Sequence, residues 1–238
     1  MWYSVLRQAS PVITVAVCIP FVYGCVGCRK DVNKDEKTPS RVALFVEAAG
    51  AGDFAAVQEF LEHGMNINAR DEETEQTALL AAVDRENFDM VRFLLQNGAD
   101  INLVGGQGFT PLHRAVLDGT PAMVLLLLDR GAYLEGQDDL GRTPLILASR
   151  YNRVDMVETL LKKGASTQSP DVLGRTPLHW AASPAVAKLL LGHGADPNAR
   201  DANGLTPWET AAKDGKQRSE VARYLRTRTT DQGEPSTK

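Results

Sequence analysis

The sequence has few residues suited to nucleophilic or metal chemistry, with three cysteines and four histidines among 238 residues. All three cysteines lie between positions 18 and 28, so no disulfide or thiolate site can form later in the chain. The HExxH, GxSxG and GxxxxGK(S/T) motifs of metalloproteases, serine hydrolases and phosphate-binding loops are also missing. These absences argue against an enzyme, and we expect no catalytic residue, no metal and no cofactor.

The charge is small and unevenly distributed. A net charge of −4 is too mild for a dedicated nucleic-acid binder, and 43% hydrophobic with 24% charged residues is ordinary globular composition. Residues 41–103 contain 12 acidic and 4 basic residues, a net charge of −8, whereas residues 104–238 contain 15 and 17, a net charge of +2. This asymmetry marks either a partner surface or simply a solvated face.

The first 28 residues are typical of a secretory signal. Arg7 is their only charged side chain, and an apolar run from Pro11 to Val22 leads into small residues. The run is short and interrupted by Pro20, which disfavours a permanent membrane span.

The segment Val22–Cys25 resembles the lipobox of bacterial lipoproteins, with an aliphatic residue at −3 and a small residue at −1. The resemblance implies a signal peptide over 1–24 and a diacylglycerol on Cys25, with Cys28 as the alternative. Residues 25–40 would then be a flexible tether between the membrane and the folded part of a membrane-anchored lipoprotein that faces the periplasm. Cleavage without lipid and an uncleaved N-terminal anchor are alternatives, and all three place the folded part outside the cytoplasm.

An internal repeat is the strongest signal in the chain. A Thr-Pro-Leu-like motif returns after 33 residues three times and after 30 residues once, at Thr77, Thr110, Thr143, Thr176 and Thr206. In phase with it, a leucine-rich pair precedes a glycine at Gly64, Gly98, Gly131, Gly164 and Gly194. Each threonine is expected to cap a short helix, and a second helix then ends at the glycine in a left-handed conformation.

This pattern resembles the ankyrin repeat, and the chain is identified as a member of that family on the Thr-Pro-Leu-His motifs at Thr110 and Thr176. The resemblance implies an all-α repeat solenoid of about six helix-turn-helix units with hairpin-like fingers over residues 41–228. The expected units are 41–73, 74–106, 107–139, 140–172, 173–202 and 203–228, and 229–238 is expected to be a disordered tail. We expect a monomer.

Two units depart from the pattern. Thr77 is followed by Ala-Leu-Leu, without proline or histidine, which predicts a looser first turn. The fifth unit is three residues short, which predicts a tight turn between its helices, with Ser183 as N-cap and Pro184 as the first helical residue.

The resemblance also assigns roles to side chains. His113 and His179 are expected to hydrogen-bond to nearby backbone and threonine groups, not to catalyse or bind metal. Family members bind proteins on the concave face formed by the first helices and the fingers, where residues four, seven and eight places after each threonine should point; these include Ala81, Leu147 and Thr210. Aromatic and arginine side chains make strong binding anchors. The predicted partner-binding residues are Arg114, Leu117, Arg142, Arg150, Tyr151, Arg175 and Trp180.

The sequence therefore predicts a protein-binding module of the cell envelope, without a nucleic-acid partner or a small-molecule substrate. The alternative is an immunity or inhibitor protein that occludes an extracytoplasmic toxin or enzyme. In a competing interpretation of the surface, Trp180 packs in the core and the arginines are merely solvated.

Overall fold

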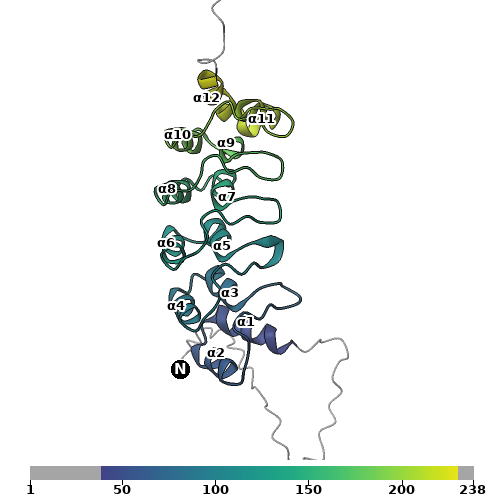
Figure 1. Ribbon diagram of the computed structural model, residues 1–238, viewed down its shortest axis with the longest axis vertical. Coiled ribbons are helices and arrows are strands. Elements are labelled where there is room, and N and C mark those ends of the chain that lie inside the picture. Colours follow the sequence, from purple (N-terminus) through teal and green to yellow (C-terminus); the bar gives the residue numbers. More distant parts are fainter. Residues whose placement is uncertain (1–38, 230–238) are drawn as a thin grey trace, which may run out of the picture. The chain divides into compact units, whose positions relative to one another are not determined.

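A computed structural model describes residues 39–229, which form one stack of helix pairs (Figure 1). The structure does not describe Cys25, Cys28, the predicted signal peptide, or the predicted tether up to residue 38. Residues 230–238 of the predicted tail also lie outside the described residues, and Thr229, where that tail was expected to begin, is the last residue of a helix. Of the helices in the described range, none combines the length and the apolar character that a membrane crossing requires.

The helices form two rows that run the length of the stack (Figure 1). The inner row contains α1 (Arg41–Ala51), α3 (Ala78–Asp84), α5 (Pro111–Asp118), α7 (Pro144–Arg150), α9 (Pro177–Trp180) and α11 (Pro207–Lys213). The outer row contains α2 (Phe54–Glu62), α4 (Phe88–Gln96), α6 (Pro121–Asp129), α8 (Val154–Lys162), α10 (Pro184–Gly192) and α12 (Ser219–Thr229). Two short 3-10 helices, η1 (Gly106–Gly108) and η2 (Gly215–Arg218), complete the elements of this range.

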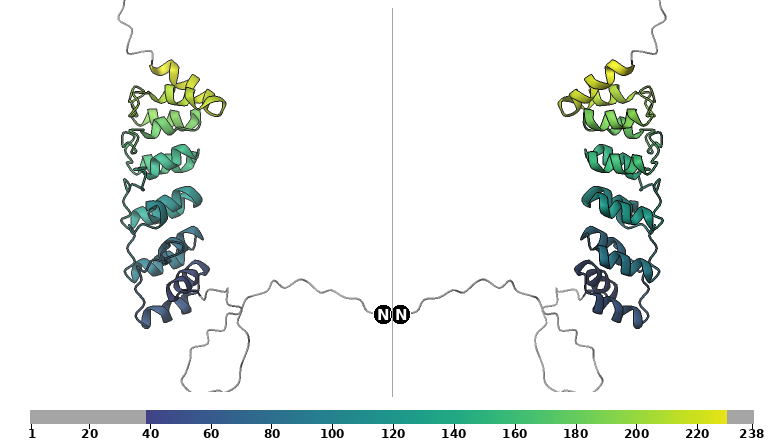
Figure 2. Two further views of the ribbon diagram at one scale, coloured as in Figure 1. Left: turned by 90° about the vertical axis from the view of Figure 1, so that its right-hand side faces the viewer. Right: turned by 90° about the vertical axis from the view of Figure 1, so that its left-hand side faces the viewer.

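The fingers are the loops that lead from each outer helix to the next inner helix. They project from the inner row, away from the outer helices, and the stack curves gently (Figures 1 and 2). Within residues 39–229 the only β-type pairing is an isolated bridge between Arg70 and Thr77. The predicted all-α repeat solenoid is therefore confirmed.

The threonine caps form as the sequence predicts. Thr110 accepts a hydrogen bond from the backbone N–H of His113 at 3.3 Å, and Pro111 is the first residue of α5. Thr143 accepts from the N–H of Ile146 at the start of α7 in the same way. Because the capping oxygen satisfies an otherwise unpaired helix N–H, each motif fixes where an inner helix begins.

The glycines end the outer helices in the predicted left-handed conformation. Gly164 has a φ of 90°, and the next residue, Ala165, donates its N–H to the carbonyl of Leu160 at 3.0 Å. This pattern satisfies the last carbonyls of α8 and turns the chain toward the next finger.

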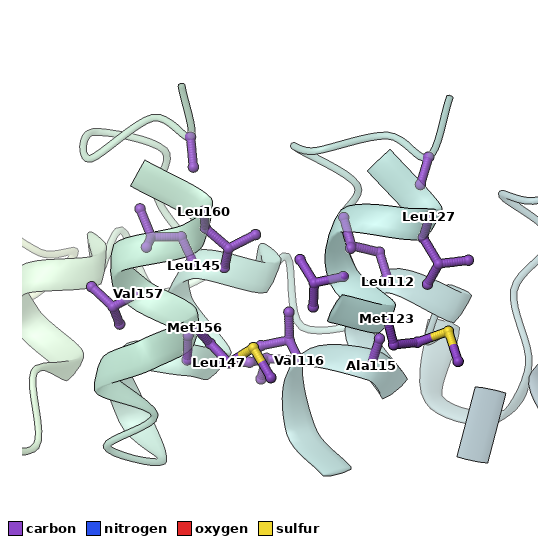
Figure 3. Close-up of a cluster of buried hydrophobic side chains, with 14 of the residues drawn as sticks. Leu112, Ala115, Val116, Met123, Leu127, Leu145, Leu147, Met156, Val157 and Leu160 are labelled. Carbon is purple, nitrogen blue, oxygen red and sulfur yellow. The ribbon is translucent and has the colours of Figure 1, made fainter. Parts of the chain in front are cut away.

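The core is shared between successive units (Figure 3). Leu112 and Leu127 of one unit and Met156 and Leu160 of the next are completely buried in the same cluster. Because this cluster contains side chains from successive units, their burial depends on the stacking of neighbours.

One expectation about the concave face is wrong. Ala81, Leu147 and Thr210, each four residues after a motif threonine, are buried instead of facing solvent. Their helices pack side by side in the inner row, so short side chains at this position are covered by the neighbouring units. Only long side chains there, such as Arg114 and Trp180, remain partly exposed.

The two atypical units also differ from expectation. Thr77 still caps α3 by accepting from the N–H of Leu80 at 3.2 Å, so the looser turn is not observed. In the fifth unit Ser183 caps α10 as predicted. However, α9 has four residues where α7 has seven, while the turns that follow both helices are three residues long. The missing residues are therefore taken from the helix, and the predicted tight turn is wrong.

Candidate binding surface

Each of the last three fingers is organised by one buried aspartate. Asp171 accepts hydrogen bonds at Oδ1 from the backbone N–H groups of Leu173 and Arg175, both at 2.9 Å. Asp138 and Asp201 accept from the residues two and four places later in the same way. We did not predict this role, although the signal was available: each aspartate lies five residues before a motif threonine.

Neighbouring fingers are bonded to one another through their backbones. The backbone N–H of Asp139 donates to the carbonyl of Gln107 at 3.2 Å. The N–H of Val172 donates to the carbonyl of Leu140 at 3.1 Å, and the N–H of Ala202 donates to the carbonyl of Leu173 at 2.9 Å. The fingers therefore present one continuous surface.

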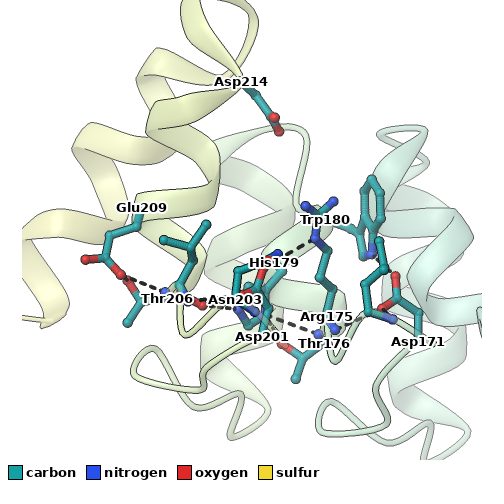
Figure 4. A network of polar contacts seen from close by, with 12 residues as sticks. Asp171, Arg175, Thr176, His179, Trp180, Asp201, Asn203, Thr206, Glu209 and Asp214 are labelled. Atoms are coloured by element: carbon teal, nitrogen blue, oxygen red, sulfur yellow. Dashed lines mark hydrogen bonds and ion pairs between the residues drawn. The ribbon is translucent and has the colours of Figure 1, made fainter.

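The histidines have the structural role that the family resemblance implies. The Thr110 N–H donates to Nδ1 of His113, so Nε2 carries the proton and donates to the carbonyl of Arg142 at 3.0 Å. His179 makes the equivalent contacts to Thr176 and to the carbonyl of Leu205 (Figure 4). Burial lowers the pKa of both imidazoles and so favours the neutral form that accepts these N–H groups at Nδ1. Each histidine connects an inner helix to the next finger.

Trp180 is held in one orientation by charged neighbours. Its indole Nε1–H donates to Oδ2 of Asp171 at 2.8 Å. The guanidinium carbon of Arg150 lies 4.6 Å from the centre of its ring system and that of Arg175 lies 5.0 Å away. Figure 4 shows Trp180 beside Arg175 and Asp171. Trp180 is half-buried, so neither a pure core role nor a free side chain describes it.

The two arginines differ in their charge partners. Arg175 lies 3.5 Å from Oδ2 of the buried Asp201. Burial alone would raise the pKa of Asp201, but the N–H groups of Leu205 and Asn203 outweigh it and hold the pKa below its usual value. Arg150 also lies over Tyr151, at 5.7 Å, and no carboxylate within residues 39–229 pairs with it.

The structure removes Arg142 from the predicted partner-binding set. Its side chain is buried and donates from Nε to Oδ2 of Asp138 at 2.7 Å, within its own finger. It also lies over the ring of Phe109, 5.9 Å from the centroid. A guanidinium enclosed in this way stabilises the finger and cannot anchor a partner without leaving its site.

Arg114 and Leu117 lie on α5, in the third unit. Arg114 donates to both carboxylate oxygens of Asp84, at 2.7 and 2.6 Å, and this hydrogen bonding raises the pKa of Arg114. Leu117 is half-buried, and its carbonyl accepts from Arg153. The charge of Arg114 is therefore already satisfied within the stack.

The remaining predicted residues and a group of exposed apolar residues belong to the fourth and fifth units. Tyr151 at the end of α7 is 54% exposed, and Leu140, Val172 and Leu173 at two finger tips are 51%, 64% and 46% exposed. We call the following set the unit 4–5 surface: Leu140, Arg150, Tyr151, Val172, Leu173, Arg175 and Trp180. Over the described part of the chain, no three His, Cys, Asp or Glu side chains gather as a metal site would require.

Comparison with known families agrees with this geometry. A model of ankyrin repeats in three copies matches residues 18–105, 44–138 and 97–171, and a model of a single ankyrin repeat matches residues 173–202. The chain therefore belongs to the ankyrin repeat family. Proteins of this family are generally not enzymes, and their repeats serve as protein–protein interaction modules.

The chain spans about a quarter or less of the length of the curated relatives it matches. The chain is 38% identical over 87 residues to an ankyrin repeat protein of Fowlpox virus, covering 37% of this chain and 26% of the relative. It is 36% identical over 66 residues to ankyrin repeat domain-containing protein 40 of Mus musculus, covering 28% and 18%. The palmitoyltransferase Hip14 of Drosophila melanogaster is 37% identical over 75 residues, covering 31% and 12%. The likeness to so small a part of these relatives does not transfer their activities.

Proposed function

We propose that this chain is a non-enzymatic adaptor that binds a protein partner on the concave face of its third to fifth units. The observation that carries the proposal is the unit 4–5 surface, where four large apolar side chains stay exposed in the two units that also hold the half-buried Trp180. Single exposed apolar residues are normal, but a group that includes aromatic and arginine side chains is characteristic of interaction sites.

The orientation of Trp180 supports this function. Its hydrogen bond to Asp171 and its contacts with two arginines restrict its rotamers before any partner arrives. Less conformational entropy is then lost on binding, so more of the contact energy contributes to affinity.

The proposal includes display outside the cytoplasm of a bacterial cell. It rests on the apolar leader and on the lipobox-like segment that ends at Cys25. A diacylglycerol there would hold the repeats at a membrane through burial of its acyl chains.

Site-specific photocrosslinking tests the binding function. A benzophenone amino acid is placed at Tyr151 and, as the matched control, at Tyr133, which is also exposed but lies outside the unit 4–5 surface. We expect a discrete protein adduct from position 151 in intact cells, lost in the Trp180→Ala variant, and none from position 133. Equal labelling from both positions, or no adduct from 151, would contradict the proposal.

The location has its own test. Intact-mass analysis of the membrane fraction should show a mature chain that begins at an acylated Cys25, and the Cys25→Ala variant should remain unprocessed. An intact Met1 would contradict this part and leave the binding function standing.

The immunity or inhibitor role is a second candidate, favoured by the net charge of −8 over residues 41–103. An acidic surface there would mask a basic active site and act mainly on association rate. The purified protein should then abolish the activity of the crosslinked partner at a 1:1 ratio, and an adaptor would leave that activity unchanged.

A further inference from the structure

The carboxylates that contact Trp180, Arg175 and Arg142 are already used inside the fold. Asp171 accepts three hydrogen bonds, two from finger N–H groups and one from Trp180. Asp201 is buried against its own finger and Arg175, and Asp138 is taken by Arg142. The exposed Asp139 lies at the tip of the preceding finger, whereas the exposed charge that contacts Trp180 is the positive charge of Arg150.

Arg150 is the part of that charge available to a ligand. It is exposed at the end of α7, and its guanidinium is placed over Trp180 and Tyr151. Since no carboxylate within residues 39–229 pairs with its N–H donors, two of them can match a carboxylate of a ligand.

Exposed apolar side chains are linked to this donor through Trp180 and Asp171. Asp171 connects the two features, since Oδ2 accepts from Trp180 while Oδ1 accepts from the N–H of Leu173. Val172 is bonded through its N–H to the carbonyl of Leu140 in the preceding finger. Three exposed aliphatic side chains thus lie on two bonded fingers, one of which is joined through Asp171 to the tryptophan that Arg150 contacts.

From these contacts we propose that the unit 4–5 surface binds an acidic segment of another protein in which an Asp or Glu lies close to a bulky apolar residue. The carboxylate pairs with Arg150, and the apolar residue packs on Leu140, Val172 and Leu173. This inference rests on the proposed binding function and specifies its partner. The aliphatic tips favour a peptide over nucleic acid, whose charged backbone has no use for them.

The test selects binders from a displayed library of random 12-residue peptides and measures them as synthetic fluorescent peptides. Enriched peptides should share an acidic and a large apolar residue. Arg150→Ala should weaken them roughly tenfold or more, as loss of a charge-assisted bidentate contact does. Arg130→Ala, which removes an exposed arginine at the end of α6 in the outer row, is the matched control and should leave affinity unchanged.

A charge swap guards against misfolding of a single variant. Arg150→Glu should lose the acidic peptide and bind the same peptide with its Asp or Glu replaced by Lys. Enriched peptides that lack an acid, or that ignore Arg150, overturn the inference, as does a library without any binder. If the enriched peptides crosslink to a benzophenone amino acid placed at Leu117 and not to one at Tyr151, the proposed binding function stands, and only the assignment of the unit 4–5 surface is overturned.

Two other occupants give distinct results. Self-association in sedimentation that Arg150→Ala abolishes would mean that a second copy of this chain, through its acidic residues 41–103, is the occupant. Tight binding of a labelled 20-nucleotide RNA at physiological salt, lost in Arg150→Glu, would make nucleic acid the occupant. Either result overturns the proposal.

Discussion

Arg218 donates from Nη2 to the backbone carbonyl of His179 at 2.6 Å, across 39 residues of sequence. Its Nε donates to the carbonyl of Ala181 at 3.0 Å, and its Nη1 pairs with Asp214 at 2.6 Å. These carbonyls lie at the end of α9, the shortest inner helix. The last unit therefore supplies hydrogen bonds that a longer α9 would make within itself.

Arg218→Ala should lower the free energy of unfolding by about 2 kcal/mol, because it removes charge-assisted hydrogen bonds and leaves half-buried carbonyls unpaired. Urea denaturation followed by circular dichroism measures the change. Arg223→Ala, an exposed arginine on α12, should change stability by less than about 0.5 kcal/mol. Equal effects of the two variants would contradict the role of Arg218.

Stability should fall as the pH drops below 6.5, the ordinary histidine pKa. Burial lowers the pKa of His113 and His179 in the folded state, so the unfolded chain binds more protons in that range and gains relative to the folded chain. The free energy of unfolding between pH 7.5 and 5 should decline less in a His113→Gln, His179→Gln double variant than in the wild type. An unchanged slope would show that these imidazoles do not control it.

Met156→Ala should destabilise the stack by roughly 2–5 kcal/mol, because the completely buried side chain packs in a cluster shared by two units. Leu140→Ala removes a leucine that is half exposed, and should cost less than about 1 kcal/mol. Thermal and urea denaturation compare the two. A small effect at Met156 would mean that the units do not share one core.

Gly141→Ala tests the contact between fingers. Gly141 has a φ of 70°, and an added Cβ would lie 2.9 Å from the backbone nitrogen of Val172. Gly204 occupies the same place in the last finger with a φ of 74°, but a Cβ there meets nothing within 4 Å. Both variants carry the left-handed strain, so Gly141→Ala should be the more destabilising by about 1–2 kcal/mol. Equal losses would mean that the finger-to-finger contact contributes nothing.

Much of the fold could be predicted because it is encoded locally and repeated. The hydroxyl of Thr143, the proline after it and the left-handed Gly164 each act within a few residues of their own position. Five in-phase copies then identify the helix pairs, and the structural role of His113 and His179 follows from their place in the motif.

The rest depends on contacts between units that the single motif does not encode. Leu147 was expected to face solvent, but the neighbouring inner helices cover it. Arg142 and Arg175 occupy equivalent places in two fingers, yet only Arg142 is buried, because Phe109 and the preceding finger lie beside it. The capping of α9 by Arg218 joins residues in two different units and has no local pattern.

The amide-to-carbonyl bonds between successive fingers join one repeat to the next, whereas the bonds within each helix stay inside one repeat. The amide of Val172 is protected from exchange by its hydrogen bond to the preceding finger. Its deuterium uptake therefore reports the separation of two fingers and not the fraying of one helix. A ligand bound across two fingers would slow deuterium exchange of the amides in both fingers at once. Binding could therefore be measured by exchange without labelling the ligand.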